Sequence, residues 1–272
     1  MEPLHAAADF IRQADGLLIT AGAGIGVDSG LPDFRGNQGF WKAYPPLAKA
    51  GIEFTAIASP VAFRDDPALA WGFYGHRLQL YRDTVPHEGF AILLEMAARM
   101  EKGCFVFTSN VDGQFQKADF DPERLVECHG SIHHLQCMNA CTSAIWPADD
   151  VAPVVDHARC RMVSEMPRCP HCGELARPNI LMFNDGDWVP DRMEMQHARL
   201  QTWVSSVQRP VVIESGAGTA IPSVRRLGEV FKAPLIRINP RESEVHRGSD
   251  IALPTGALNG LRMLQAELAG MA

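Results

Sequence analysis

Short apolar runs alternate along this chain with longer segments in which apolar residues recur every three or four positions. The runs predict buried strands at residues 16–19, 103–108, 125–128, 210–214, 235–238 and 251–253. Helical periodicity is found at residues 3–13, 60–83 and 90–100. Apolar strands that alternate with helices indicate an α/β fold, in which a parallel sheet is covered by helices on both faces.

Two segments lack this regularity. Residues 38–50 combine aromatic side chains with a Pro45-Pro46 pair, so we expect a mobile or irregular connection there. Residues 142–167 form the least regular stretch, with scattered prolines and acids. No internal repeat is evident.

Composition narrows the class of protein. A chain of 272 residues that is 46% hydrophobic can bury a sizeable core, in one large domain or in a large domain with a satellite. Its net charge of −7 gives no general attraction to nucleic acid. Residues 1–15 lack the basic start and apolar core of a signal peptide, and no apolar run is long enough to span a membrane. Seven cysteines, an odd number, suit a reducing compartment, so we expect a soluble cytoplasmic protein.

A glycine-rich segment, residues 20–36, follows the first apolar run. Gly22 and Gly24 stand where a buried strand turns into a loop, and backbone without Cβ atoms can approach a pyrophosphate closely. Val27 stands where the usual dinucleotide motif has its third glycine. A structural turn alone gives no reason for the Pro-Asp-Phe-Arg string at residues 32–35.

The whole string resembles the signature of the sirtuin family, which runs from G-A-G to S-G-L-P-D-F-R. Residues 108–112, Thr-Ser-Asn-Val-Asp, are similar to the sirtuin T-Q-N-I/V-D motif, and residues 129–131 match its H-G-S element. Two cysteine pairs follow in the family's order. The resemblance covers most of the chain and implies an NAD-dependent protein-lysine deacylase with a Rossmann-like large domain and a structural zinc ion.

The resemblance also implies a division of the chain. We expect a Rossmann-like NAD-binding large domain formed by residues 1–44, 101–134 and 177–272. The small domain would consist of a helical module at residues 45–100 and a zinc-binding module at residues 135–176.

The cysteine spacing itself points to a metal site. Cys169 and Cys172 have the two-residue spacing and the following glycine of a zinc knuckle, and three residues separate Cys137 from Cys141. Such pairs rarely arise among scattered core cysteines. Other residues remain open as substitute ligands: Cys160, His133, His134 and His171.

Most predicted site residues come from the resemblance. His129 would be the general base toward a ribose hydroxyl, and Asn110 and Asp112 would orient the ribose and the nicotinamide amide. Taken without the family match, Asn110 and Asp112 could equally form an Asx turn. The remaining predicted contacts of NAD are Gly22, Ala23, Gly24, Asp33, Phe34, Arg35, Ser109, Gly216, Ala217 and Asn239.

The chain departs from the family pattern in three places. Ser109 replaces a glutamine that contacts the ribose. Residues 213–218, Ile-Glu-Ser-Gly-Ala-Gly, stand at the second phosphate-side loop, usually G-T-S, and lack the expected hydroxyls. Residues 183–187, Phe-Asn-Asp-Gly-Asp, replace the F-G-E substrate loop.

Tyr74 and Arg77 form a Y-x-x-R pair that resembles the carboxylate-binding pair of sirtuins that remove succinyl and malonyl groups. Residues three apart share one face of a helix, where a guanidinium and a phenol can bind a carboxylate. An aromatic core residue beside a solvated arginine is the equally weighted alternative.

We therefore expect removal of acetyl, succinyl or malonyl groups from lysine side chains, with nicotinamide and O-acyl-ADP-ribose as products. The expected partners are acyl-lysine proteins, with no direct nucleic-acid or membrane partner, and the sequence does not decide between a monomer and a homo-oligomer. The alternatives are mono-ADP-ribosyl transfer, NAD hydrolysis, or nucleotide sensing without turnover.

Overall fold

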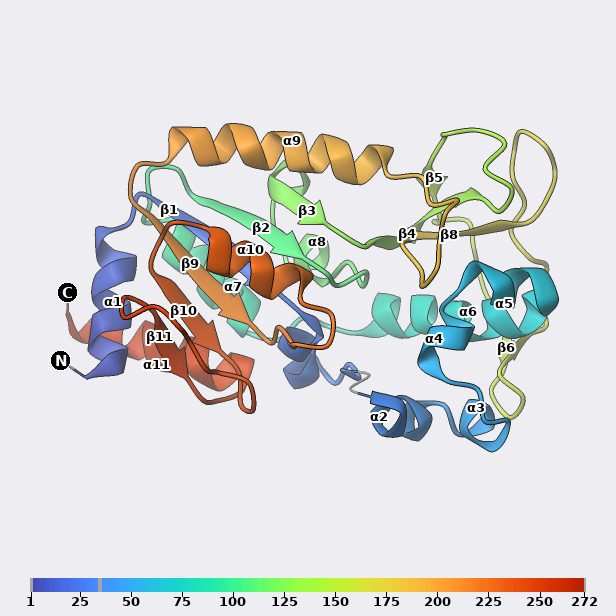
Figure 1. The fold of residues 1–272 in the computed structure, drawn as a ribbon, viewed down its shortest axis with the longest axis horizontal. Coiled ribbons are helices and arrows are strands. Elements are labelled where there is room, and N and C mark those ends of the chain that lie inside the picture. Colours follow the sequence, from blue (N-terminus) through green and yellow to red (C-terminus); the bar gives the residue numbers. More distant parts are fainter. Residues whose placement is uncertain (1, 34–35, 272) are drawn as a thin grey trace.

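The computed structural model describes residues 2–33 and 36–271, so the predicted site residues Phe34 and Arg35 lie outside the described residues. Its central feature is a parallel six-stranded sheet (Figure 1). In spatial order its strands are β11 (Ile251–Leu253), β10 (Leu235–Ile238), β9 (Pro210–Ser215), β1 (Gly16–Ala21), β2 (Cys104–Thr108) and β3 (Leu125–Glu127). The six apolar runs therefore form this one sheet.

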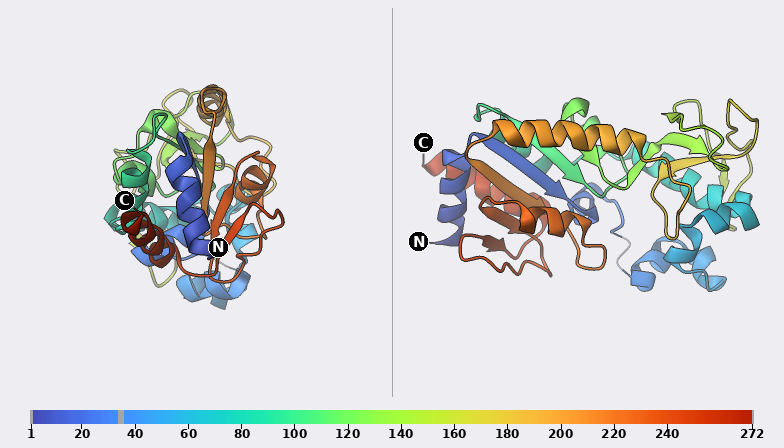
Figure 2. Two further views of the ribbon diagram at one scale, coloured as in Figure 1. Left: turned by 90° about the vertical axis from the view of Figure 1, so that its left-hand side faces the viewer. Right: turned by 45° about the horizontal axis from the view of Figure 1, so that its top comes forward.

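Helices cover both faces of the sheet, as the two views in Figure 2 show. One face packs against α1 (Pro3–Gln13), α7 (Gly89–Ala97) and α11 (Ala257–Gly270). The other packs against α9 (Asp191–Ser206) and α10 (Ser223–Val230). In β1 the side chains of Leu17 and Ile19 enter the first core and Leu18 the second, as the two-residue period of a strand requires. The predicted α/β class is confirmed.

A second module lies beyond the carboxyl ends of the strands, at the opposite end of the molecule from both chain termini (Figure 1). Its helices are α2 (Gly36–Ala43), α3 (Pro45–Lys49), α4 (Phe54–Ile57), α5 (Pro60–Asp65) and α6 (Pro67–Asp83). They pack against an antiparallel sheet of β5 (Trp146–Pro147), β4 (Gly130–Cys137) and β8 (Ala176–Ile180). The fully buried Trp71 of α6 joins the two parts, because its Nε1 donates to the carbonyl of Ala176 at 3.0 Å.

The remaining elements are short. A 3-10 helix, η1 (Ala23–Ser29), follows β1, and β6 (Val155–Asp156) pairs with β7 (Arg161–Met162) within the irregular stretch. The connection from β2 to β3 contains α8 (Gln114–Lys117) and η2 (Pro122–Arg124).

Two local predictions were wrong. Residues 38–50 lie largely in helices α2 and α3, because prolines in the first turn of α3 need no N–H donor there and favour a helix start. Residues 60–83 form two helices rather than one. Asp66 ends α5 and begins α6, where its Oδ1 accepts the N–H of Leu69 at 3.1 Å.

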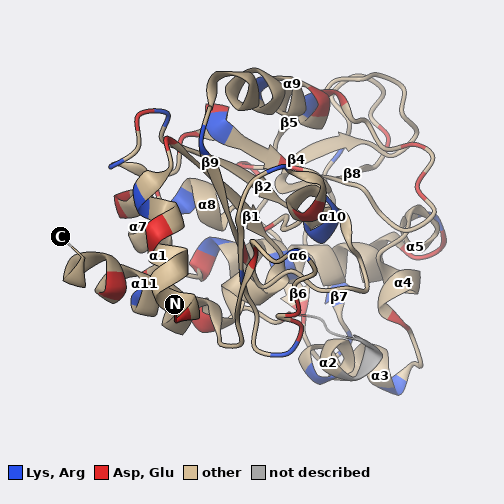
Figure 3. Ribbon diagram, turned by 60° about the vertical axis from the view of Figure 1, so that its left-hand side comes forward, with Lys and Arg blue, Asp and Glu red and all other residues tan. Residues whose placement is uncertain are grey.

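Charged residues of both signs are distributed along the fold. The ribbon in Figure 3 shows acidic and basic positions intermixed on helices and loops. Among the helices in the described part of the chain, none is both long enough and apolar enough to cross a membrane.

Four cysteine sulfurs meet where β4 ends and the turn before β8 begins. The Sγ atoms of Cys137, Cys141, Cys169 and Cys172 all lie within 4.8 Å of one another, with 3.6 Å between Cys137 and Cys172. Zn–S bonds of about 2.3 Å at tetrahedral angles place sulfurs about 3.8 Å apart, so the four residues fit a structural zinc ion. In the described part of the chain, Cys160, His133, His134 and His171 belong to no such cluster.

Replacing Cys172 should remove the metal. We expect Cys172→Ser to lower bound zinc from about one ion per chain toward none and to unfold the β4–β8 region, because zinc binding and folding are coupled. Metal analysis of the purified protein with near-ultraviolet circular dichroism measures both effects. Cys104→Ser, outside the cluster, is the matched control, and a folded, active Cys172→Ser protein without metal would contradict the assignment.

Candidate functional site

A cleft of about 550 Å³ opens at the carboxyl ends of β1, β2 and β9, between the sheet and the second module. In open parallel sheets this edge is where ligands bind. Of the described residues that the sequence predicts for the site, all except Asn239 and the four cysteines line this cleft: Gly22, Ala23, Gly24, Asp33, Tyr74, Arg77, Ser109, Asn110, Asp112, His129, Gly216 and Ala217.

The glycines of the two predicted phosphate loops face each other. The N–H of Gly24 donates to the carbonyl of Gly216 at 3.0 Å. A Cβ added to Gly22 would lie 2.8 Å from the Cα of Ala217, and one on Gly24 would lie 2.7 Å from the Cα of Gly216. Gly216 itself has a φ of 65°, which favours glycine. Both loops therefore need glycine in order to touch, and their contact forms the floor of the cleft.

The second phosphate-side loop does present a hydroxyl to the cleft, although the sequence pattern did not reveal it. Ser215 is fully buried at the end of β9, whereas Thr219 lines the cleft. The Oγ1 of Thr219 donates to Oε1 of Glu242 at 2.5 Å. Glu242 also lines the cleft, and sequence reasoning missed both residues because neither belongs to the quoted motifs.

Asn239 lies behind the wall of the cleft. Its side chain is fully buried, and its Nδ2 donates to the carbonyl of Ala217 at 2.8 Å. Its Oδ1 accepts the N–H groups of Arg241 and Glu242, each at 3.0 Å. The described geometry makes Asn239 a brace between the loops after β9 and β10.

Asn110 and Asp112 follow β2 and are both buried. The Nδ2 of Asn110 donates to the carbonyl of Gly22 at 3.1 Å, which ties the end of β2 to the first glycine loop. Oδ1 of Asp112 accepts the N–H of Gln114 at 3.0 Å, an Asx turn. Asp112 thus makes the structural turn and also faces the cleft, so the two interpretations are compatible.

The environment of Asp112 changes its acidity. Burial raises its pKa to about 6, while the hydrogen bond from Gln114 and the charge of Arg77 act in the opposite direction. A carboxyl group that titrates near neutrality in a cleft is a common feature of functional sites.

His129 follows β3 and faces the same cleft. Its Nε2 lies 3.2 Å from Oγ of Ser223, the first residue of α10, a neighbour that no motif indicated. Burial lowers the pKa of His129, so its imidazole is neutral at neutral pH and can accept a proton. Gly130 is required next to it, because its φ is 80° and a Cβ would lie 2.0 Å from the carbonyl oxygen of Asn179.

Tyr74 and Arg77, on α6 of the second module, line the same cleft as the loop that follows β8. Both are buried, and Nε and Nη2 of Arg77 donate to the hydroxyl of Tyr81 at 2.9 and 2.7 Å. The guanidinium carbon lies 5.2 to 5.8 Å from the ring centroids of Phe73, Tyr74 and Tyr81. Arg77 is therefore not a solvated surface residue, and Tyr81 is a further cleft residue that the pair did not reveal.

The loop at residues 183–187, which replaces the F-G-E motif, contains a left-handed backbone conformation of the kind that favours glycine. Asn184 has a φ of 55°, a conformation that asparagine tolerates well. The side chain of Asp185 is fully buried and pairs with Arg177, with N–O distances of 2.7 and 2.8 Å. This pair anchors the loop to β8, so that Phe183 and Met182 line the cleft.

The raised pKa of Asp112 leads to a pH-dependent prediction. Its folded-state pKa of about 6 exceeds the usual 3.8, so folding becomes less favourable as the pH rises through this range and the carboxylate ionises. We expect Asp112→Asn to raise the free energy of unfolding by about 3 kcal/mol at pH 7.5 and by less than about 1 kcal/mol near pH 4. Urea denaturation at several pH values measures this difference. The exposed Asp119→Asn serves as control, and a gain independent of pH would contradict the assignment.

Comparison with known proteins agrees with this geometry. Residues 22–208 match the Sir2 family. An NAD-dependent protein deacylase of Thermus thermophilus is 30% identical over 271 residues, covering 97% of this chain and 94% of the relative. One from Aquifex aeolicus is 28% identical over 249 residues, covering 90% and 92%. The crystal structure of a Sir2 homologue–NAD complex has the same fold, with a TM-score of 0.73, 22% identity and coverage of 97% and 93%.

The family match spans well over half of the chain, and the Thermus relative aligns along nearly all of it. The chain therefore belongs to the Sir2 family.

Proposed function

We propose that this protein removes acyl groups from lysine side chains of other proteins in an NAD-dependent reaction. The observation that carries the proposal is one cleft that joins the two glycine loops, the neutral imidazole of His129 and the buried pair Asn110 and Asp112. The relatives named NAD-dependent protein deacylase support the same activity.

The floor formed by Gly22, Gly24 and Gly216 lines the cleft and would face the pyrophosphate of NAD, because backbone without Cβ atoms can approach a phosphate closely. NAD would supply a ribose from which nicotinamide leaves. Asp112 and Asn110 would hold the nicotinamide and ribose, since both are fixed by hydrogen bonds to main chain before any ligand binds. Ala23, Asp33, Ser109 and Ala217 line the same space.

His129 would accept a proton from a hydroxyl of that ribose. Its ring is supported for this role by Ser223 at 3.2 Å and by burial, which keeps the imidazole neutral. A positioned base of this kind contributes roughly 10²- to 10⁴-fold to the rate.

We also propose a division into two domains close to the one that the motifs indicate, with shifted bounds: α2 (Gly36–Ala43) packs in the core of the small domain, and α7 (Gly89–Ala97) packs on the sheet of the large domain. The separate core around Trp71, Phe73 and Tyr74 supports a distinct helical module. The cleft would then lie between the two domains, which is a usual position for a substrate site.

The acyl group itself is the finer part of the proposal. Arg77 and Tyr74 lie at the end of the cleft away from the glycine loops, and Tyr81 fixes the guanidinium of Arg77 by two hydrogen bonds. A buried guanidinium there favours an acyl chain that ends in a carboxylate, such as succinyl or malonyl. We propose such groups as substrates in addition to acetyl-lysine.

The base can be tested directly. We expect His129→Ala to lower deacylation at least about 100-fold while NAD binding is retained, because the imidazole moves a proton and does not hold the nucleotide. Mass spectrometry of NAD incubated with acetyl- and succinyl-lysine peptides measures turnover, and calorimetry measures binding.

His197→Ala, at a half-buried position of α9 that does not line the cleft, is the matched control. Full activity of His129→Ala would remove this residue from the mechanism. Modified protein or free ADP-ribose in place of acyl-ADP-ribose in the wild type would instead assign ADP-ribosyl transfer or NAD hydrolysis.

The acyl preference has its own test. Arg77→Met should lower kcat/KM for a succinyl peptide by roughly 10- to 100-fold, which corresponds to the loss of a hydrogen bond to a charged group. The kcat/KM for an acetyl peptide should stay nearly unchanged. Arg64→Met, at an exposed position of neighbouring α5, provides the comparison. Equal losses on both peptides would show that Arg77 acts only in packing.

A further inference from the structure

We propose that Ser223 is a positioning residue for His129, whose hydroxyl holds Nε2 of the imidazole in both its neutral and its protonated state. In catalytic triads a buried carboxylate orients the histidine base and stabilises the imidazolium, and here an uncharged hydroxyl takes that place. The inference rests on the proposed function, because it assigns a partner to the proposed base. Ser223 belongs to none of the motifs and is not among the described residues that line the cleft.

The side chain of Ser223 faces the imidazole and has no structural task of its own. Its Oγ lies 3.2 Å from Nε2 of His129, and within the described part of the chain this is its only side-chain hydrogen bond. A serine at a helix start often accepts the backbone N–H groups of the first turn, but Pro222 occupies the N-cap of α10 and makes no such bond. The hydroxyl therefore stays available to the imidazole.

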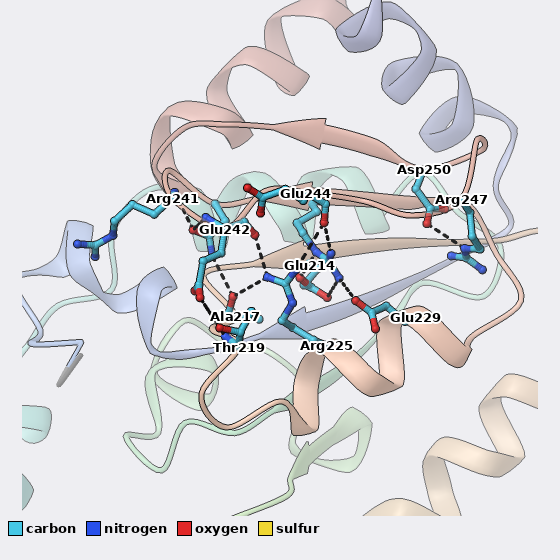
Figure 4. Close-up of polar contacts among 12 residues, drawn as sticks. Glu214, Ala217, Thr219, Arg225, Glu229, Arg241, Glu242, Glu244, Arg247 and Asp250 are labelled. Atoms are coloured by element: carbon cyan, nitrogen blue, oxygen red, sulfur yellow. Dashed lines mark hydrogen bonds and ion pairs between the residues drawn. The ribbon is translucent and has the colours of Figure 1, made fainter. Parts of the chain in front are cut away.

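Helix α10 holds Ser223 in a fixed place on the sheet. Val224 is buried in the core on this face of the sheet. Nη1 of the buried Arg225 donates to the carbonyl of Glu242 at 2.8 Å, which ties the first turn of α10 to the loop after β10 (Figure 4). His129 follows β3 of the same sheet, so the hydroxyl and the imidazole come from two rigid elements, as a positioning contact requires.

A second contact of the ring decides which nitrogen accepts the proton. Burial lowers the pKa of His129, and a hydrogen bond with the main chain of Ser109 raises it. A bond that raises the pKa of an imidazole is made to an acceptor, here the Ser109 carbonyl. Because a neutral imidazole has a single N–H and Ser109 accepts it, the lone pair lies on Nε2 and Ser223 donates to it.

A hydroxyl can serve the base before and after proton transfer, because it has one O–H and two lone pairs. In the proposed step the proton passes from the ribose hydroxyl to Nε2, and the electron pair of that O–H bond stays on the ribose oxygen. The O–H of Ser223 turns away, and a lone pair of its Oγ accepts the new N–H of His129. The ring thus keeps one orientation throughout the transfer.

The absence of charge on Ser223 keeps His129 a base at neutral pH. A carboxylate in its place would favour the imidazolium and raise the pKa by about 1 to 3. Charged side chains on the elements around His129 are Asp33, Arg77, Asp112, Glu127, Arg225 and Glu242. None of these described residues is among the influences on the pKa of His129, which are burial and the main chain of Ser109.

Substitutions that remove or keep the hydroxyl separate positioning from packing. Ser223→Ala should lower kcat for an acetyl-lysine peptide roughly 3- to 10-fold, which corresponds to the loss of one hydrogen bond, and should change KM for NAD and for the peptide by less than about twofold. Ser223→Thr keeps the hydroxyl and should restore most of kcat. Thermal denaturation checks that each variant is folded.

Ser223→Asp tests the contact without any turnover. Its carboxylate should raise the pKa of His129 by at least about 1, because it favours the protonated imidazole. An NMR titration of the imidazole Cε1–H resonances measures this pKa, and the spectrum of His129→Ala identifies the resonance. In the pH profile of kcat, the rise on the acidic side should move to higher pH by the same amount, because only the neutral imidazole accepts a proton.

Ser205→Ala and Ser205→Asp make the same changes at an exposed position of α9 and should leave kcat and the pKa of His129 unchanged. An unchanged kcat in Ser223→Ala, an equal loss in Ser223→Ala and Ser223→Thr, or an unchanged pKa in Ser223→Asp would overturn the assignment. A wild type that does not deacylate peptides would overturn the proposed function, while the NMR titration would still show whether Ser223 contacts His129.

Discussion

The contact between the loop after β1 and the loop after β9 leaves no room for a side chain at its centre. Cβ atoms on Gly22, Gly24 or Gly216 would lie within 2.8 Å of opposing main chain. Because β1 and β9 are neighbours in the sheet and the chain leaves them toward the same edge, their loops must meet there. The distance between them sets the floor of the cleft, and the positions of Asn110 and Ala217 follow from it, since Asn110 donates to the carbonyl of Gly22. A larger residue at this contact would separate the walls of the nucleotide site before it affected any residue that performs chemistry.

Buried ion pairs hold the loops that surround this floor. Glu214 and Arg237 face each other across β9 and β10, next to the second glycine loop, and Arg177 of β8 pairs with Asp185 of the loop that follows β8. Removing charges from water costs several kcal/mol per ion, so such pairs add little net stability, although loss of one partner costs about 3 to 5 kcal/mol. These pairs therefore act mainly on the positions of the loops, because a guanidinium donates its hydrogen bonds in fixed directions and so restricts where the carboxylate can lie. The chain fixes both ends of the cleft in this way.

Much of the fold could be predicted from the sequence, because six apolar runs mark the six strands of the parallel sheet and the cysteine spacing marks the sulfur cluster. Strands β4 and β8 were not predicted, since their residues are mixed in polarity and are buried by partners distant in sequence. The same limit applies to Glu242 and Tyr81, whose place in the cleft depends on Thr219 and Arg77 in three dimensions. The sequence of residues 183–187 differs from the family's F-G-E motif. Asn184 nevertheless adopts a left-handed backbone conformation, which favours glycine. The spacing of residues in the sequence predicts groups that act together within one segment. It does not predict contacts between residues that are distant in the sequence and meet only in the folded chain.

The two ends of the cleft differ in the sign of their charge. Arg77 lies among aromatic rings in the part of the cleft that we propose for the acyl group, and Glu242 lies beside Thr219 of the second glycine loop. Asp112 lines the same cleft, where burial raises its pKa and the charge of Arg77 lowers it. A carboxylate that neutralised Arg77 would remove that lowering influence, so an acidic acyl chain would favour the protonated form of Asp112. Because a protonated carboxyl donates a hydrogen bond and a carboxylate only accepts, the charge of an acyl chain bound at Arg77 would, on the proposed function, change the hydrogen bonds that Asp112 offers to the nicotinamide.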